Sequence, residues 1–348
     1  MIISPYSEDI RISSYTIYKS GILYKAVPHK AGLNRISGTV ALDVLQEAVD
    51  NLTNGGLIYL AQGTFPVASK LTISTSNVAI KGAGQFLSVI QATESMESVL
   101  EITGSGWHIE SLGVDANSHA TIGVTIAASA SRGFLHRVNI DDPVQDGLGV
   151  SNVSGGKISF VRVSLGSGAR YGIAFDGIDM EVIGSLVRGI SSTINRPEAA
   201  YYITGGGGSK FIGGHVWGYK NAALLVGANR VAFIGEALND SSEHGVVFDT
   251  TSSYDIRFRG CEHRDVCRSA NNSFDVYHVN VNVSRVSIIG CEAVAALTNK
   301  PRYFLNQASG TGTGCMLIGN LARNMQTGFA SGWSDGVNSC VVAHNLNY

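Results

Sequence analysis

The segment ALDVLQEAVDNLTNGGLIYLAQGTFPV, residues 41–67, changes its hydrophobic period halfway along its length. Its first half repeats apolar residues at the spacing of one helix face: Ala41, Leu45, Ala48 and Leu52. The turn Asn54-Gly55-Gly56 tolerates the positive backbone angles that end a helix. The apolar stretch LIYLAQGTF that follows is typical of a strand. The segment therefore predicts one amphipathic helix over 40–53, followed directly by β structure.

Composition favours a large β-rich chain. The 348 residues include 42 glycines and only 6 prolines, without the period of collagen, which indicates many short strands and tight turns. A net charge of −2 excludes a broad basic face for nucleic acid. No apolar run reaches the length of a membrane span, and the N-terminus lacks the pattern of a signal peptide.

A repeat runs through the rest of the chain, hidden by loops of unequal length. Short strands such as SNVAIKG, NRVAFIG and SRVSIIG each end near a glycine or polar residue, which serves as an anchor. The anchors are Gly82, Ser111, Arg137, Arg162, Gly184, Gly213, Gly235, Gly260, Gly290, Gly319 and His344. They are 22 to 30 residues apart. Such a period, made of strands without helices, predicts a solenoid of stacked coils.

Strand alternation tests this register. The residues two positions before the anchors are all apolar: Ile80, Ile109, Leu135, Phe160, Val182, Phe211, Phe233, Phe258, Ile288, Leu317 and Val342. We expect this column to point into the core. A second strand recurs in each unit, as in GVTI, ALLV and YFL. Each coil therefore has at least two strands, and the helix over 40–53 is expected to cover the first coil, whose edge would otherwise stay unpaired.

The helix, the Asn-Gly-Gly turn and the extended YLAQGTF segment resemble the start of right-handed parallel β-helices of the pectate-lyase-like superfamily, which includes phage tailspikes. The resemblance is sharp over residues 39–66 and continues as a repeat pattern to residue 348. It implies an all-β fold, a right-handed parallel β-helix of about 10–11 coils with an N-terminal capping helix. We expect residues 1–38 to form an N-terminal strand or hairpin segment and residues 39–348 to form the β-helix domain.

The five cysteines favour a reduced core over a disulfide framework. Cys261 and Cys291 each follow an anchor by one residue, and Cys315 and Cys340 each precede one by four. Stacked coils would make each pair neighbours in a ladder of buried thiols. Zinc at Cys261, His263 and Cys267 does not match the usual ligand spacing. Calcium on turn oxygens stays open as a cofactor, although no EF-hand-type loop is present; no other cofactor or metal is expected.

The densest group of titratable residues lies on two adjacent coils, in SSEHGVVFD and CEHRDVCRSANNSFDVYH. The candidate catalytic residues are Glu243, His244, Asp249, His263, Asp265, Asp275 and His278. Aligning GVVFD with VYHVN places Asp249 beside Asn280, with His278 pointing outward. Asn280 is accordingly a candidate substrate-binding residue.

Two kinds of chemistry fit this group, and a binding surface without chemistry fits it too. Glycoside hydrolysis needs two carboxylates, for which Glu243, Asp249, Asp265 and Asp275 are candidates. β-Elimination or C5 epimerisation of a uronan needs a base, from His244, His263 or His278, and a cation for the substrate carboxylate, from Arg264 or Arg268. The motif sets of polygalacturonases and alginate epimerases are absent. Alternatively, charges after strands bond turn amides or form a solvated rim.

Aromatic residues on the preceding coils offer stacking surfaces for sugar rings: Tyr202, Trp217 and Tyr219. The resemblance implies a polysaccharide as partner. Our first hypothesis is cleavage or epimerisation of an acidic polysaccharide by β-elimination-type chemistry. The alternatives are a tailspike-like glycoside hydrolase and a non-catalytic glycan-binding fibre. An extracellular or virion-associated location follows from the same resemblance.

An apolar column predicts assembly. Val161, Ile183, Ile212, Ile234, Ile289 and Ile318 precede the anchors by one residue, which places them on the outer side of the strands. Arg259 interrupts the column. Exposed apolar stripes of this length usually mark an interface, and the sequence ends inside a coil, so we expect a homotrimer of parallel solenoids.

Overall fold

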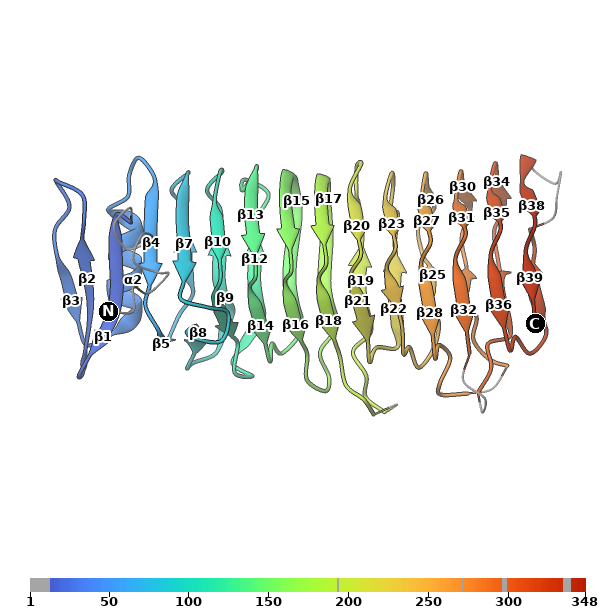
Figure 1. Cartoon of the computed structure of the whole chain (residues 1–348), viewed down its shortest axis with the longest axis horizontal. Helices are drawn as coiled ribbons and strands as arrows, with labels where there is room; N and C mark the ends of the chain where they lie inside the picture. The colour runs from blue at the N-terminus through green and yellow to red at the C-terminus, as the bar shows by residue number, and fades with distance from the viewer. Residues whose placement is uncertain (1–12, 193, 271, 296–298, 334–338) are drawn as a thin grey trace, which may run out of the picture. The chain divides into compact units, whose positions relative to one another are not determined.

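The computed structural model describes residues 13–348 apart from 193, 271, 296–298 and 334–338. It divides into two compact units, residues 1–163 and 164–348, which are described separately. Each unit is a stack of short parallel strands (Figure 1). No helix in the described residues is long and apolar enough to cross a membrane.

The first unit opens with antiparallel strands and the helix. Strand β1 (Tyr15–Ser20) pairs antiparallel with β2 (Leu23–Pro28), which pairs antiparallel with β3 (Ile36–Gly38). Helix α2 (Ala41–Asp50) follows and buries one apolar face against β2, β3, β5 (Gly63–Val67) and β6 (Leu71–Ile73). The side chain of Gln46 exchanges two hydrogen bonds of 3.0 Å with the backbone of Thr72, which fixes the helix to β6.

Three stacks of parallel strands form the rest of the first unit. One holds β4 (Gly56–Leu60), β7 (Val78–Gly82), β10 (His108–Glu110), β13 (Gly133–His136) and the end of β15 (Asp146–Ser159). The second holds β5 (Gly63–Val67), β8 (Ser88–Ala92), β11 (Gly113–Asp115) and β14 (Asn139–Asp141). The third holds β6 (Leu71–Ile73), β9 (Met96–Ile102), β12 (Ala120–Ile126) and the start of β15.

The second unit repeats this arrangement. One stack, which we call stack A, joins the start of β17 (Tyr171–Ile183) to β19 (Ala199–Ile203), β22 (Asn221–Leu225), β25 (Val246–Phe248), β29 (Tyr277–Val279), β33 (Tyr303–Gln307) and β37 (Gly328–Ser331). Stack B joins the end of β17 to β20 (Lys210–Ile212), β23 (Ala232–Ile234), β27 (Arg257–Arg259), β31 (Ser287–Ile289), β35 (Met316–Ile318) and β38 (Val341–Ala343).

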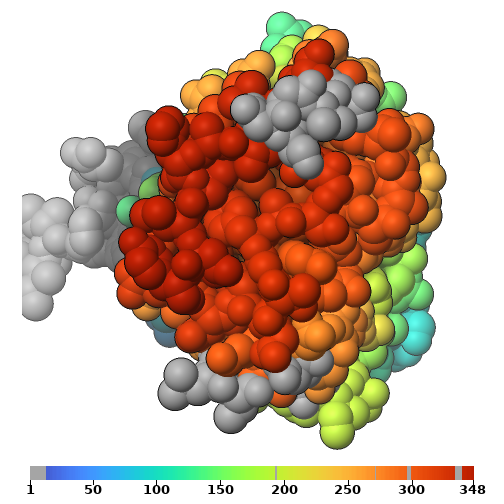
Figure 2. Space-filling view, turned by 90° about the vertical axis from the view of Figure 1, so that its right-hand side faces the viewer, coloured from blue at the N-terminus to red at the C-terminus, as the bar shows by residue number. Residues whose placement is uncertain are grey.

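A third stack, stack C, completes each coil of the second unit. It joins β18 (Leu186–Arg188), β21 (His215–Trp217), β24 (Ala237–Leu238), β28 (Glu262–Arg264), β32 (Glu292–Val294), β36 (Leu321–Arg323) and β39 (Leu346–Asn347). Short strands β26 (Ser253–Tyr254), β30 (Val283–Ser284) and β34 (Gly312–Thr313) add a small sheet. Figure 2 looks onto the last coils of this unit, coloured red.

The prediction of a parallel β-helix with an N-terminal helix is confirmed, and so is most of the inward column. Phe211, Phe233 and Phe258 stack in register, with ring centroids 5.0 and 4.8 Å apart. Most anchors take a positive φ, from Arg137 at 52° to Gly319 at 64°. A left-handed residue after each strand turns the chain into the next one, which explains why glycine recurs there.

In one coil the predicted register is wrong by two residues. Leu135 pairs with Ile158, and the left-handed residue that follows the strand is Phe160, with φ 53° and 54% exposure. Phe160 therefore takes the place of the anchor that we assigned to Arg162, and Ile158 takes the inward position. Val161, expected in the outer apolar column, is completely buried. The error arose because an aromatic residue rarely adopts this backbone conformation.

The cysteine ladders are found as predicted. All five cysteines are buried and free. Cys261 and Cys291 interact through their thiols, as do Cys315 and Cys340. Burial and the neighbouring thiol raise the pKa of Cys315 to about 11, so it stays a neutral packing group.

Candidate functional site

His278 occupies the middle of strand β29. The strand buries Tyr277 and Val279 and leaves His278 on the outer side, where its side chain is 12% exposed. In register it lies between Val247 of β25 and Asn306 of β33. The predicted outward direction of His278 is therefore confirmed, and Phe248 pairs with Val279, which sets Asp249 level with Asn280 as expected.

Asp275 lies beneath this histidine and is fully buried. Its Oδ2 atom is 2.8 Å from Nδ1 of His278, and it also accepts hydrogen bonds from Nη2 of Arg302 at 2.8 Å and Nδ2 of Asn306 at 3.0 Å. Nε of Arg302 donates to Oδ1 at 3.1 Å. Burial acts to raise the pKa of Asp275, but these donors outweigh it and hold the pKa below its usual value. The carboxylate is therefore ionised at neutral pH.

His244 stacks on His278. The two ring centroids are 4.1 Å apart at an interplanar angle of 21°, and Phe274 contacts His244 edge-on. The backbone N–H of Asp275 donates to Nδ1 of His244 at 2.9 Å. Burial, together with the neighbouring His278, lowers the pKa of His244 to about 4, so this imidazole is neutral at physiological pH.

These hydrogen bonds assign opposite tautomers to the two imidazoles. An ionised carboxylate only accepts, so Nδ1 of His278 carries a proton, and in the neutral form of the ring Nε2 keeps a lone pair. His244 accepts at Nδ1, so its proton lies on Nε2. Neither Nε2 atom has a hydrogen-bond partner among the described residues, and neither is fully buried. The pair thus offers one acceptor and one donor side by side.

The same three residues come close enough to be considered as a metal site. Their potential ligand atoms lie within 4.8 Å of one another. The carboxylate of Asp275, however, is already held by the guanidinium of Arg302, and a metal ion would place a second positive charge beside it. Calcium, which takes about six to eight oxygen ligands, finds too few here. The donor set fits a hydrogen-bonded dyad better than a metal centre.

A row of polar side chains continues from His244 along the preceding coils. The backbone N–H of His244 donates to Oδ1 of Asn221 at 3.2 Å. Beside it, Lys220 pairs with Glu198 at 3.0 Å. Glu243 is half-buried, and burial, followed by the charge of Glu198, raises its pKa. Cationic, neutral and acidic groups therefore lie next to one another along this edge of stack A.

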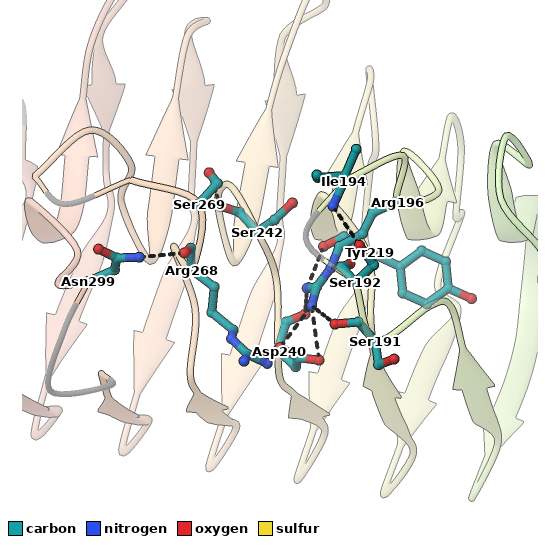
Figure 3. A network of polar contacts seen from close by, with 10 residues as sticks. All are labelled: Ser191, Ser192, Ile194, Arg196, Tyr219, Asp240, Ser242, Arg268, Ser269 and Asn299. Atoms are coloured by element: carbon teal, nitrogen blue, oxygen red, sulfur yellow. Dashed lines mark hydrogen bonds and ion pairs between the residues drawn. The ribbon is translucent and has the colours of Figure 1, made fainter.

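The loops beside this row are tied together by a buried arginine (Figure 3). The side chain of Arg196 is completely buried, and it donates to the backbone oxygens of Ser191 and Ser192 and to the carboxylate of Asp240 at 3.2 Å. Arg268 pairs with the same carboxylate from the following coil. The network holds the loop before β19 against the loops of later coils.

The structure brings only part of the predicted site together. His263 is 0% exposed and shares a 2.8 Å hydrogen bond with the hydroxyl of Tyr277, so it lies inside the core. Tyr219 is also buried. Arg264 pairs with Glu262 on stack C, and Asp265 adopts a positive φ in the exposed turn after it. These residues do not join His278.

Two of the predicted aromatic residues do lie on the outside. Tyr202 stacks on Tyr171, with ring centroids 4.2 Å apart and 7° between the planes. Trp217 lies under the guanidinium of Arg188, 5.0 Å from the ring centroid. Both rings are half-buried, and each has one face covered by its neighbour.

Sequence reasoning missed several residues of this site. Asn306 could have been found by aligning VYHV with FLNQ, because His278 and Asn306 are in register. Arg302, Glu198 and Arg196 lie on loops of variable length, where the repeat gives no register. No signal in the sequence pairs these loop residues with their partners.

The chain is similar to known proteins in its structure, and comparisons of its sequence find no match. No family model and no curated protein sequence matches the chain. The tailspike protein of E. coli bacteriophage HK620, in complex with a pentasaccharide, superposes with a TM-score of 0.68 at 14% identity, over 89% of this chain and 63% of that chain. A mannuronan C-5 epimerase A-module from Azotobacter vinelandii gives 0.61 at 15%, over 88% and 95%.

A third solved structure extends the range of activities. DFA-IIIase from Arthrobacter chlorophenolicus superposes with a TM-score of 0.58 at 10% identity, over 87% of this chain and 94% of that chain. At such identities the likeness shows the fold, a parallel β-solenoid, and nothing more. The chain spans less than two thirds of the HK620 tailspike, so the activity of that whole protein does not transfer.

Proposed function

We propose that the chain acts on a polysaccharide and that His244, Asp275 and His278 carry the chemistry. The solved structures with this fold include an epimerase of mannuronan and a tailspike with a bound pentasaccharide, which supports a glycan as the substrate class. The observation that carries the proposal is the pair of complementary imidazoles. A lone pair and an N–H next to each other suit proton transfer at a sugar ring.

In this proposal His278 is the general base. Asp275 orients the ring and stabilises the imidazolium that forms when Nε2 takes a proton. Its full ionisation suits that role, because the negative charge offsets the developing positive one. His244 stays neutral and donates from Nε2 to an oxygen of the substrate. Abstraction of the C5 proton of a uronate would then lead to β-elimination or, with return of the proton to the other face, to epimerisation.

An acidic sugar also needs a cation near its carboxylate. Arg302 is a suitable group, because Nε and Nη2 bind Asp275 and leave Nη1 for a ligand, and its side chain is 33% exposed. Arg264 and Arg268 suit this role less well, because they form ion pairs with Glu262 and Asp240. Asp249 and Asn280, which follow β25 and β29 two coils and one coil before β33, stay candidates for substrate contact at the far end of the same strands.

Glycoside hydrolysis is the second candidate function, favoured by Glu243. A half-buried carboxyl with a raised pKa, influenced by the charge of Glu198, matches the needs of a general acid and its carboxylate partner. Asp275 does not suit this role, because three side chains already hold it. Glycan binding without chemistry is the third candidate.

A panel of uronans and neutral polysaccharides distinguishes these functions. Ultraviolet absorbance of an unsaturated uronate indicates a lyase, and deuterium incorporation at C5 in D₂O without cleavage indicates an epimerase. New reducing ends without absorbance indicate a hydrolase. Binding without any of these products supports a glycan-binding fibre. We propose Tyr202 and Trp217 as sugar-stacking residues in each case, and an extracellular or virion-associated location.

We also propose that the second unit assembles through stack B. Ile212, Ile234, Ile289 and Ile318 lie in register on its outer face, and Ile234 is 36% exposed. Arg259 takes the place between Ile234 and Ile289. Three solenoids side by side would cover this column. Light scattering tests the proposal: a mass near 36.7 kDa at micromolar concentration would reject it, and about three times that mass would support it.

A further inference from the structure

A cationic cavity lies on a different part of the second unit, where the strands of stack B begin. Successive coils place one residue of a turn above the next, in the order Asp179, Gly208, Arg230, Asp255 and Arg285. Backbone hydrogen bonds support this order: Gly208 donates to Arg230 at 2.9 Å, and Arg230 and Asp255 each donate, at 3.0 Å, to the residue just before Asp255 and Arg285. All five adopt a positive φ, so the side chains of the four that are not glycine leave the backbone in the same way.

The second column is formed by the first residues of the strands. Its order is Glu181, Lys210, Ala232, Arg257 and Ser287, as the strand register shows. The two columns are offset by two residues along the chain. Gly208 and Ala232 have no large side chain, whereas their neighbours in the two columns are mostly large and charged.

These two small residues leave room for a cavity of about 260 Å³. Gly208, Lys210, Arg230, Ala232, Asp255 and Arg257 line it. Gly208 has φ 106°, a conformation that strains any residue with a side chain, and a Cβ atom there would also displace the carboxylate of Asp179. The space is thus fixed by the backbone rather than by the rotamer of one side chain.

The charges around the cavity do not balance. Asp255 is already held by Arg285, with Nε and Nη2 at 2.5 and 2.8 Å from its two oxygens. Lys210 has Glu181 at 3.9 Å, the long end of ion-pair distances. Arg230 and Arg257 make no ion pair within the part of the chain that the structure describes. The residues that line the cavity therefore include three cations and one carboxylate, which Arg285 already holds, while Asp179 and Glu181 lie beside the lining.

We propose that this cavity binds one anionic group of a ligand, a carboxylate or a sulfate. Both groups match the N–H donors of arginine, and two guanidinium groups and one ammonium group from successive coils line the cavity. The cavity is open to solvent at the surface of the coils, so the anion can belong to a long chain. That the anion belongs to an acidic polysaccharide rests on the proposed function. The anion site itself does not depend on that function.

The test measures binding of the full chain to immobilised dextran sulfate, polygalacturonate and neutral dextran. We expect binding to at least one of the two anionic polymers, with none to dextran, and the stronger polymer identifies the group. Arg257→Gln removes one donor and should weaken binding about tenfold, since a hydrogen bond to a charged group contributes that much. Ala232→Leu keeps every charge but fills the cavity, and should weaken binding to a similar extent.

Arg132→Gln is the matched control, because Arg132 is an exposed arginine with φ 55° in the first unit, far along the sequence from the cavity. Thermal unfolding of each variant excludes misfolding as the cause. The proposal is overturned if Arg132→Gln and Arg257→Gln weaken binding equally, if Ala232→Leu binds like the original protein, or if neither anionic polymer binds. Dextran sulfate contains no uronate for the proposed chemistry to act on, so failure of the anion site and failure of the proposed chemistry are distinguishable.

Discussion

Nδ1 of His278 lies 2.8 Å from Oδ2 of Asp275, and the backbone N–H of that same aspartate donates to Nδ1 of His244. One residue thus sets the protonation pattern of both imidazoles, through its side chain for one and through its main chain for the other. The two rings are on adjacent coils, and their relation depends on the register of β25 and β29.

His278→Gln should lower turnover on the true substrate roughly 100-fold or more, the usual contribution of a general base. Glutamine keeps a hydrogen bond toward Asp275 but cannot take up a proton. Initial rates and thermal unfolding should be measured together. His215→Gln is the control, since His215 is an exposed histidine on stack C. Equal rates for both variants on a substrate that the original protein converts would place the chemistry elsewhere.

Glu236→Gln should change how stability depends on pH. The carboxyl of Glu236 is buried and accepts hydrogen bonds from Gly214 at 2.8 Å and Tyr201 at 3.1 Å. Burial raises its pKa from 4.5 to about 7. Between these values the folded state holds a proton that the unfolded state has lost, so stability falls as pH rises, by about 3 kcal/mol over the window.

Glutamine has no such titration. Urea unfolding of both proteins at pH values between 4.5 and 7 should give a difference in unfolding free energy that shifts in favour of the variant as pH rises. Burial lowers the pKa of His244 to about 4 and that of His263 to about 3, so these two residues make the protein more stable as pH rises. Their effect is common to both proteins and cancels in the difference. A difference that does not vary with pH would contradict a protonated Glu236.

Arg196→Ala should lower the free energy of unfolding by about 3 kcal/mol, because it leaves several loop carbonyls without a donor and leaves Asp240 only the more exposed Arg268 as a partner. Arg264→Ala removes an exposed arginine of similar type and should change stability by less than about 1 kcal/mol. Chemical denaturation measures both. Comparable losses would show that the network in Figure 3 does not hold the loops.

Thiol titration of the denatured protein without reductant should count five free thiols. Cys261 and Cys291 are side by side, so oxidation of this pair is the event that would lower the count to three. Side chains of parallel neighbours point the same way, which suits a disulfide poorly. A count below five in freshly purified protein would contradict the reduced ladders.

The sequence predicts the core better than the surface because strand alternation has a fixed period and loops have none. The column from Val182 to Leu317 follows from that period alone. The same rule applied to Glu262–Arg264 would have placed His263 inside, where it lies. Arg302 reaches Asp275 from a loop on the next coil, and no periodic signal links them. His278 was predicted because it stands on a strand.

The left-handed residue that ends each strand of stack B has a consequence for how such a chain can change its length. The segment from one of these residues to the next, as from Gly260 to Gly290, is one coil. Its insertion or loss would leave the inward-facing residues aligned with the inward-facing residues of the neighbouring coils. A single inserted residue inside a strand would exchange inward-facing and outward-facing residues. Whole coils are therefore the unit in which the molecule can grow or shrink during evolution. Lengthening by this route would extend a binding surface without redesign of the core.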